Sequence, residues 1–420
     1  MCMLTGLGSL EQFWQRSRNN LSVISHSHHK NFWLFESSVW FHMLANSMLA
    51  IYIPILMLQN GFDLTDILFF YFIFHIINAP ANILGGYLVS QIGAKKTIII
   101  ATLFQIAFFI WYSVLEPGTL WGLVALGALG AIYDALYYTA SMYLFMQTTT
   151  DVNNSGKNTG ILYAIVRSAG LIGPIIGSTI LLLGGNPGWV ILAVIVSFVI
   201  SILPLFWTSL EQGDRAVMMP IREFIKEPYV IANHISLGLY KIHESIGAIV
   251  WPVFIYLYFG TLESIAIIAV MIPIVGLITS YASGWINLRW RYHAIALSAL
   301  LVGLVWVGRI MFEGGLWYYG SIAFVATIMI LMQVPIDANI FRAGNQTNPL
   351  TASVFKNMFS MGTKAILFGI LYVSSLSFND TFTIAAIAMG LLVTLNIYRI
   401  HLKSRTQSSC LLYTSDAADE

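Results

Sequence analysis

Charged side chains lie inside several long apolar stretches of this chain, where they could bind or move other charges. A charge at the centre of a membrane helix costs roughly 2.5–3.5 kcal/mol on insertion scales, so each one needs a partner or a function. Such positions are typical of ion and substrate pathways. The acidic members are Glu36, Asp134, Glu244 and Asp337, and the basic members are Arg167, Lys241, Arg309, Lys356 and Lys364.

Two acid–base pairs are predicted from depth along helical hairpins. At about 1.5 Å per residue, Asp134 and Arg167 lie at similar depth on either side of one turn. Asp337 and Lys356 do the same around a later turn, nearer the predicted cytoplasmic end. This spacing predicts one pair in each half of the chain. For Asp337 and Lys356 we expect a cytoplasmic gate, with a substrate site as the alternative.

Two further pairs are predicted within single helices. Lys241 and Glu244 are three residues apart and therefore share a helix face. Arg309 and Glu313 are four apart at the outer end of a helix, and we expect an interfacial pair without a transport role.

Coupled proton transfer is the chemistry that these groups could perform. A carboxylate that loses its basic partner to a substrate takes up a proton more readily, which couples protonation to transport. We expect Asp134 or Glu244 to take up the proton. Arg167, Lys241 or Lys364 would then tune the pKa of that carboxyl group or bind an anionic group. The alternative is a set of static salt bridges that fix helix packing. Polar residues on neighbouring helices are predicted to line the same cavity: His42, Asn46, His75, Asn78, Tyr137 and Tyr138.

Enzymatic and metal chemistry find no support in the sequence. The two cysteines, Cys2 and Cys410, stand at opposite ends, and no Cys/His metal spacing occurs. Nucleophile elbows and phosphate-binding loops are also missing, so we expect no cofactor, no metal and no catalysis. The net charge of +1 gives no reason to expect nucleic-acid binding. Energy must then come from an ion gradient, or transport is passive.

The bilayer must be the solvent for most of the chain. Of its 420 residues 58% are hydrophobic and 9% charged, and the mean hydropathy is +0.77. Soluble proteins carry about 25% charged residues. A membrane helix needs about 20 mostly apolar residues. This predicts an all-α membrane protein with twelve transmembrane helices at 33–58, 64–90, 96–115, 119–147, 158–183, 188–208, 229–258, 263–287, 292–312, 316–341, 351–375 and 380–401.

Basic residues orient the predicted helices. Of the 20 Lys and Arg, five lie within spans and all the others fall in loops on one side. Because cytoplasmic loops carry the excess of Lys and Arg, both termini are predicted to be cytoplasmic. We expect a multi-pass protein of the bacterial inner, or plasma, membrane.

An internal repeat divides the chain. AIYIP at residues 50–54 aligns with AIVWP at 248–252, and the same offset of 198 aligns Gly86 with Gly284. Helices 1–6 therefore look duplicated in parallel as helices 7–12. The predicted organisation is a tail (1–32), two six-helix bundles (33–208 and 229–402), a cytoplasmic linker (209–228) and a second tail (403–409). Residues 410–420 (CLLYTSDAADE) resemble a translated sequencing adapter, and we expect them to be foreign to the native chain.

Two motifs carry a family resemblance. GGYLVSQIGAKK resembles the signature loop of the major facilitator superfamily, with Ser90 at the usual acidic position, which puts the family's latch in doubt. AGLIGPIIGS is similar to the fifth-helix motif of the family's antiporters, and plain close packing explains it equally well. GALGAIYDAL lacks the arginine of many proton-coupled drug antiporters. The matching residues are Gly86, Leu88, Gly93, Lys95 and Lys96 in the loop, and Gly173, Pro174 and Gly177 in the helix.

The resemblance implies a fold and a function. In this family helices 1, 4, 7 and 10 line a central cavity, the two halves rock around it, and members usually work as monomers. We therefore expect a secondary active transporter for a small polar or charged solute, coupled to protons or to sodium. The alternatives are a passive uniporter, a lipid-handling carrier, or a receptor or scaffold that does not transport.

Overall fold

Long α-helices make up the molecule. The computed structural model describes residues 30–148, 155–182, 187–208, 217–227, 230–283 and 290–416, and these contain no β-strand. A first helix covers residues 30–47. The others are α2 (Ile53–Gln59), α3 (Leu64–Ile92), α4 (Ala94–Ser113), α5 (Leu120–Thr148), α6 (Ser155–Leu182), α7 (Pro187–Phe206), α8 (Ile221–Phe224), α9 (Val230–Ser245), η2 (Ile246–Val250), α10 (Trp251–Phe259), α11 (Leu262–Ser283), α12 (Arg291–Met311), α13 (Gly315–Gln346), α14 (Pro349–Ser374) and α15 (Phe378–Asp416).

The helices follow the predicted spans, and the protein is an integral, multi-pass membrane protein. Within the described residues, nine helices are long and apolar enough to cross a membrane. The predicted first span is divided, α11 offers only the shorter apolar stretch Glu263–Leu277, and α14 carries two lysines. Twelve crossings therefore remain a prediction.

Two of the predicted spans are not continuous α-helices. Residues 48–52 form turns between the first helix and α2, and η2 is a π-helix between α9 and α10. Each interruption comes just before a proline at the start of the next helix, Pro54 and Pro252. Proline donates no backbone hydrogen bond, so the helix loses one hydrogen bond in the turn before it. The predicted repeat aligned these same two prolines, and the repeat itself remains a prediction.

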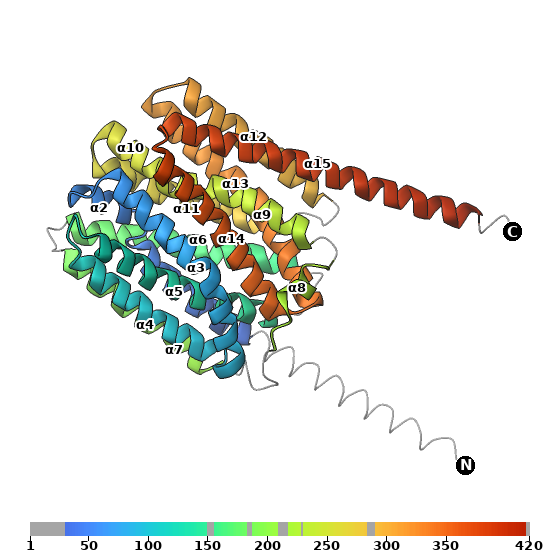
Figure 1. Cartoon of the computed structure of the whole chain (residues 1–420), viewed down its shortest axis with the longest axis horizontal. Helices are drawn as coiled ribbons and strands as arrows, with labels where there is room; N and C mark the ends of the chain where they lie inside the picture. The colour runs from blue at the N-terminus through green and yellow to red at the C-terminus, as the bar shows by residue number, and fades with distance from the viewer. Residues whose placement is uncertain are drawn as a thin grey trace, which may run out of the picture.

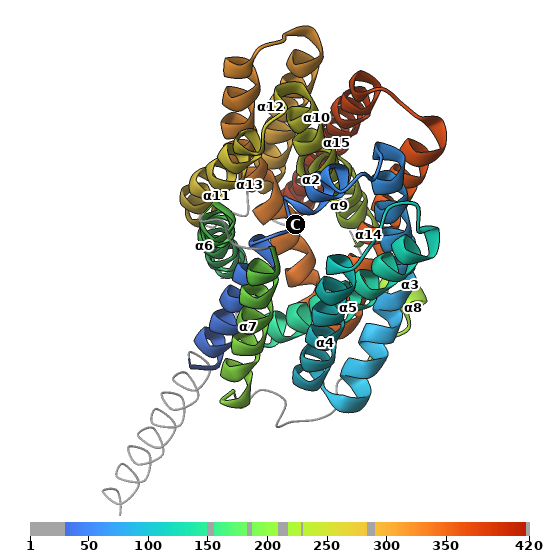
Figure 2. The same cartoon turned by 90° about the vertical axis from the view of Figure 1, so that its left-hand side faces the viewer.

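Helices from the first and the second part of the chain pack side by side. α3 packs along α14, and α6 packs along α11. Figure 2 shows these pairs on opposite sides of the bundle, with α5, α9 and α13 between them. In Figure 1, α2 and α10 lie at one end of the bundle and α8 at the other.

Glycines allow the closest helix contacts. A Cβ on Gly86 of α3 would lie 2.5 Å from Val354 Cγ2 of α14. A Cβ on Gly85 would lie 2.9 Å from the Ala135 carbonyl oxygen of α5. Adjacent glycines on one helix thus face two different neighbours, and larger residues would push α3 away from both.

Candidate substrate-binding cavity

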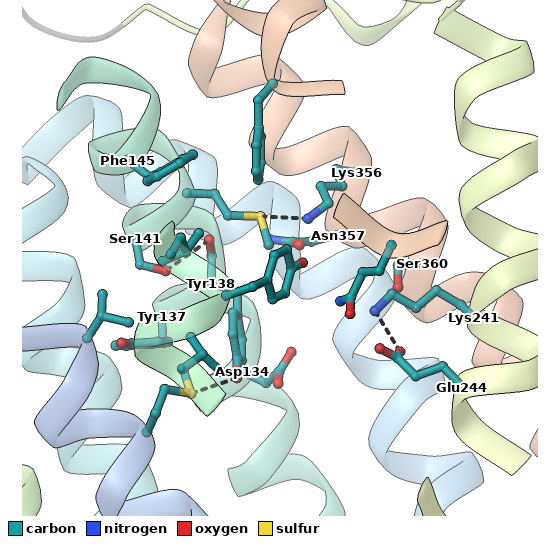
Figure 3. A pocket seen from close by; sticks show the side chains of 18 of the residues that line it. Asp134, Tyr137, Tyr138, Ser141, Phe145, Lys241, Glu244, Lys356, Asn357 and Ser360 are labelled. Atoms are coloured by element: carbon teal, nitrogen blue, oxygen red, sulfur yellow. Dashed lines mark hydrogen bonds and ion pairs between the residues drawn. The ribbon is translucent and has the colours of Figure 1, made fainter. Parts of the chain in front are cut away.

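A cavity of about 340 Å³ lies among the first helix, α5, α6, α9, α13 and α14. Figure 3 shows Asp134 and Tyr138 on one side of it and Lys241 and Glu244 on the other. Small-molecule sites typically enclose several hundred Å³ and place a few polar groups among apolar walls. The polar and charged residues of the wall are Asp134, Tyr137, Tyr138, Ser141, Tyr163, Arg167, Lys241, Glu244, Gln333, Lys356, Asn357, Ser360 and Lys364.

Asp134 is bonded by an amide rather than by a cation. Its Oδ2 accepts a hydrogen bond from Asn78 Nδ2 at 2.8 Å. Among the described residues no ion pair joins Asp134 to Arg167, so the first predicted acid–base pair is not formed. The prediction matched depth along the two helices, but pairing also requires both side chains to point at each other.

A chain of donors leads to Asp134 from across the interface of α14 with α5. Asn357 of α14 donates to Thr139 Oγ1 (3.4 Å), and Thr139 donates to Asn82 Oδ1 (2.9 Å). Asn82 Nδ2 then donates to Asn78 Oδ1 at 2.8 Å. Every hydrogen bond points toward the carboxylate, and bonds aligned in this way strengthen one another. Asn78 therefore supports the cavity from behind its wall without lining it.

Glu244 binds two lysines. Its Oε2 lies 2.6 Å from Lys241 Nζ and 3.8 Å from Lys364 Nζ. Tyr240 donates to the other carboxylate oxygen at 3.3 Å. The pair predicted within one helix is therefore formed, and α14 adds the second lysine.

Asp337 and Lys356 form the second predicted pair. Their charged atoms are 3.0 Å apart, with side-chain exposures of 2% and 5%. Tyr163 of α6 donates to Asp337 Oδ2, and Lys356 also lies over the Phe341 ring. Lys356 reaches the cavity wall, whereas Asp337 stays behind it. Helices α6, α13 and α14 thus meet at one buried ion pair.

Arg167 lines the cavity without an ion-pair partner among the described residues. Its Nε is buried and makes no hydrogen bond there. The side chain lies against Gly276 of α11, where a Cβ would come within 3.2 Å of Arg167 Cδ. The glycine thus leaves room for the arginine at the helix interface.

The predicted histidines and Asn46 lie outside the cavity wall. His42 stacks on Tyr137 with ring centroids 3.5 Å apart, and its Nε2 is 2.6 Å from Tyr133 Oη. Asn46 donates to the same hydroxyl at 2.6 Å. His75 packs against Phe368 of α14. Their helical spacing indicated a common face, but that face is turned toward neighbouring helices.

Arg309 corrects another prediction. It is 4% exposed, and its guanidinium carbon lies 3.8 Å from the centre of the Trp251 ring and 4.4 Å from that of Trp306. Its Nε donates to Ser321 at 2.9 Å. Within the described chain no ion pair connects it to Glu313. Two indole faces stabilise the cation in place of a carboxylate.

Comparison with known protein families matches residues 37–363 to the Major Facilitator Superfamily. The chain belongs to this superfamily. No curated protein matches the sequence. Among solved structures, the human organic anion transporter MFSD10 (TETRAN) aligns with a TM-score of 0.63 at 9% sequence identity. The alignment covers 88% of this chain and 99% of that one. The likeness concerns the fold alone, and the protein is a membrane transporter by family.

The superfamily loop has a clear local geometry here. Gly93 has φ of 89° and joins α3 to α4, a conformation that favours glycine. Lys95 donates to the Thr208 carbonyl at the end of α7. Ser90 donates to the Tyr87 carbonyl of its own helix at 2.7 Å, and no bond from its side chain to another helix occurs among the described residues. Leu88 packs against a buried apolar cluster, and Lys96 lies at the start of α4.

The fifth-helix motif of the superfamily acts in packing. Cβ atoms on Gly173 and Gly177 would lie 2.9 Å and 2.6 Å from the carbonyl oxygens of Leu44 and Met48. Pro174 stands between them inside α6. The motif brings α6 against the first helix, which is the packing role expected from its small residues.

Several cavity residues were not selected from the sequence as site residues. Asn357, Ser360 and Met361 of α14 come one, four and five residues after Lys356, and Tyr163 precedes Arg167 by one turn. Their position relative to a buried charge was the available signal. The apolar wall from the first helix (Phe35, Val39 and Met43) carries no such signal, because it resembles any other apolar helix face.

Proposed function

We propose that this protein is a proton-coupled secondary transporter that moves a small polar or charged solute by alternating access. The bonding of Asp134 carries the proposal. This carboxyl lines the cavity and accepts from a neutral amide, so it can gain or lose a proton without breaking an ion pair. Glu244 and Asp337, in contrast, are held by lysines.

The amide chain favours a proton over a sodium ion. A sodium site needs several free oxygen ligands, such as unwound carbonyls. The side-chain oxygens of Asn78 and Asn82 already accept hydrogen bonds from Asn82 and Thr139. The group left beside Asp134 is the Asn78 amide donor, which suits a carboxylate and repels a cation.

Alternating access would use two six-helix halves, 33–208 and 229–402. The packing of α3 on α14 and of α6 on α11 supports this, since both contacts join the first half to the second. The Asp337–Lys356 pair and the Phe145–Phe341 contact, with ring centroids 5.1 Å apart, would close one end. This is the end of α8, toward which Lys95, Arg222 and Lys226 lie, so it would face the cytoplasm.

Reconstituted liposomes with an internal pH-sensitive dye test the proposal. Pools of sugars, amino acids, organic acids, nucleosides and organic cations are screened for solute-dependent proton flux with the full-length protein. Asp134→Asn is expected to abolish this flux while keeping exchange of labelled solute. Glu36→Gln is the matched control, because Glu36 is a buried carboxyl outside the cavity wall.

Other outcomes would identify the alternatives. Equilibration of labelled solute without proton movement would indicate a passive uniporter or sodium coupling. Binding of a solute with no flux in any gradient would indicate a receptor. Full coupling in Asp134→Asn would reject Asp134 as the proton site.

A further inference from the structure

The cavity holds more positive than negative groups. Its wall carries Arg167, Lys241, Lys356 and Lys364 against Asp134 and Glu244. Asp337 behind the wall neutralises Lys356. Four basic groups therefore face three acidic ones, which leaves one positive charge in excess when all are ionised. Protonation of Asp134 would raise the excess to two.

The described ion pairs leave a positive charge at Glu244, which faces two lysines, and they leave Arg167 and Asp134 outside any pair. Glu244 contacts both Lys241 and Lys364, and Asp337 contacts Lys356. Arg167 is the cation of the cavity wall that enters none of the ion pairs formed by the described residues. Its Nε is buried without a hydrogen-bond partner, although the residue borders the cavity.

An arginine in this setting is suited to one kind of ligand. The guanidinium group is planar and presents paired donors that match the two oxygens of a carboxylate. A cation inside a membrane protein is costly without a counter-charge, and a bound anion would lower that cost. Gly276 leaves the space in which the arginine stem lies.

The rest of the cavity wall is apolar and suits a ligand with an apolar body. Phe35 and Val39 of the first helix, Phe145 of α5 and Phe341 of α13 border the cavity. The volume of about 340 Å³ accommodates a molecule with one or two rings. Aromatic side chains of this kind stack on flat rings.

We propose that the substrate is a small organic monoanion with an apolar or aromatic body, and that Arg167 binds its carboxylate. This deepens the proposed transport function and rests on it. Binding of a monoanion neutralises the cavity while Asp134 is ionised. Arg167 thereby becomes the residue that selects anions over neutral or cationic molecules of the same shape.

Binding to the purified full-length protein tests the assignment. Three series of matched compounds are used: benzoate, 2-naphthoate and indole-3-acetate, each beside its amide and its amine analogue. The shift of the thermal unfolding midpoint is measured over a concentration range of each compound. At least one carboxylate should raise the midpoint, and its amide and amine should not.

Variants then separate binding from folding. Arg167→Gln should weaken the carboxylate's apparent affinity by about tenfold or more, the loss of one charge-assisted contact, and Arg167→Lys by less. Lys226→Gln removes a charge from an exposed position and should bind like the unmodified protein. The ligand-free midpoint of each variant shows that it is folded. Equal or better binding of the amines, an unchanged affinity in Arg167→Gln, or no binding by any carboxylate would overturn the assignment.

Flux of the same compounds distinguishes the two proposals. If an amine or amide gave proton-coupled flux and the carboxylate did not, the proposed transport function would stand and the proposed anionic substrate would be rejected. Carboxylate binding lost in Arg167→Gln, with no flux in any gradient, would retain the anion site and reject the carrier.

Discussion

Two acid–base sets, each predicted across one helical hairpin, have different bonding in the structure. Asp337 and Lys356 are 3.0 Å apart and almost fully buried, and Tyr163 donates to the carboxylate. Asp134 accepts from Asn78 instead, and Arg167 forms no ion pair among the described residues. In each set a residue from a third helix bonds the carboxylate. Tyr163 of α6 donates to Asp337, and Asn78 of α3 donates to Asp134. Similar depth in the membrane therefore does not ensure pairing. Asp337 and Lys356 bond each other, whereas Asp134 and Arg167 both remain available to a ligand.

The largest expected effect follows from breaking the closed pair. Lys356→Met leaves Asp337 buried without its cation and should cost about 3–5 kcal/mol of unfolding free energy. Denaturation of the detergent-solubilised protein measures the loss. The double variant Asp337→Leu/Lys356→Met should recover most of it, because apolar groups of similar volume replace a buried pair well. An unchanged stability in Lys356→Met would show that the pair is not a structural lock.

A smaller loss is expected from the amide that bonds Asp134. Asn78→Leu removes the donor to Asp134 Oδ2 and the acceptor of Asn82. Leaving buried polar groups unpaired should cost about 1–3 kcal/mol. Asn379→Leu at an exposed position is the control and should have little effect. Equal losses in the two variants would contradict a supporting role for Asn78.

Displacing Arg167 should have a modest effect on stability and a clear effect on binding. A Cβ at residue 276 would come within 3.2 Å of Arg167 Cδ, so Gly276→Ala should cost about 1 kcal/mol, the lower end of overpacking penalties. Carboxylate affinity should fall because the guanidinium shifts. Gly390→Ala is the matched control, since nothing lies within 4 Å of its Cβ position. Full affinity in Gly276→Ala would show that the position of Arg167 does not matter.

Removing the unpaired charge should change stability least. Arg167→Gln removes a partly buried cation that enters no ion pair among the described residues, so the unfolding free energy should stay within about 1 kcal/mol of the original or increase. The same denaturation measurement compares it with Lys356→Met. If Arg167→Gln lost as much unfolding free energy as Lys356→Met, Arg167 would have a structural partner of its own. The contrast between the Asp337–Lys356 pair and Arg167 would then not hold.

Hydropathy and charge predicted the helices well because they act locally. The helices of the described chain follow the predicted spans, and the family is confirmed. The two breaks, at residues 48–52 and in η2, were missed because an apolar composition does not distinguish a π-helix or a turn from an α-helix. Pro54 and Pro252 were the available signals.

The site was predicted in part. The structure places Asp134, Arg167, Lys241, Glu244, Lys356, Lys364, Tyr137 and Tyr138 in the wall of one cavity, and their roles in proton coupling, binding or gating stay a prediction. His42 and His75 were predicted to line the cavity because a polar side chain on an apolar helix suggests a water-facing side. In the structure both rings stack on aromatic side chains of neighbouring helices. Arg309 was assigned to the surface from its place in the helix, and two tryptophans from other turns bury it.

The amino-acid sequence by itself determined the membrane class, the approximate helix positions and most of the charges inside the bundle, because these depend on the cost of placing each residue in lipid. Only the tertiary structure decided which charge meets which partner. Ion pairs form over 3–4 Å between side chains on different helices, and a small rotation of a helix exchanges one partner for another. The contrast between the Asp337–Lys356 pair and Arg167 is therefore a property of helix packing.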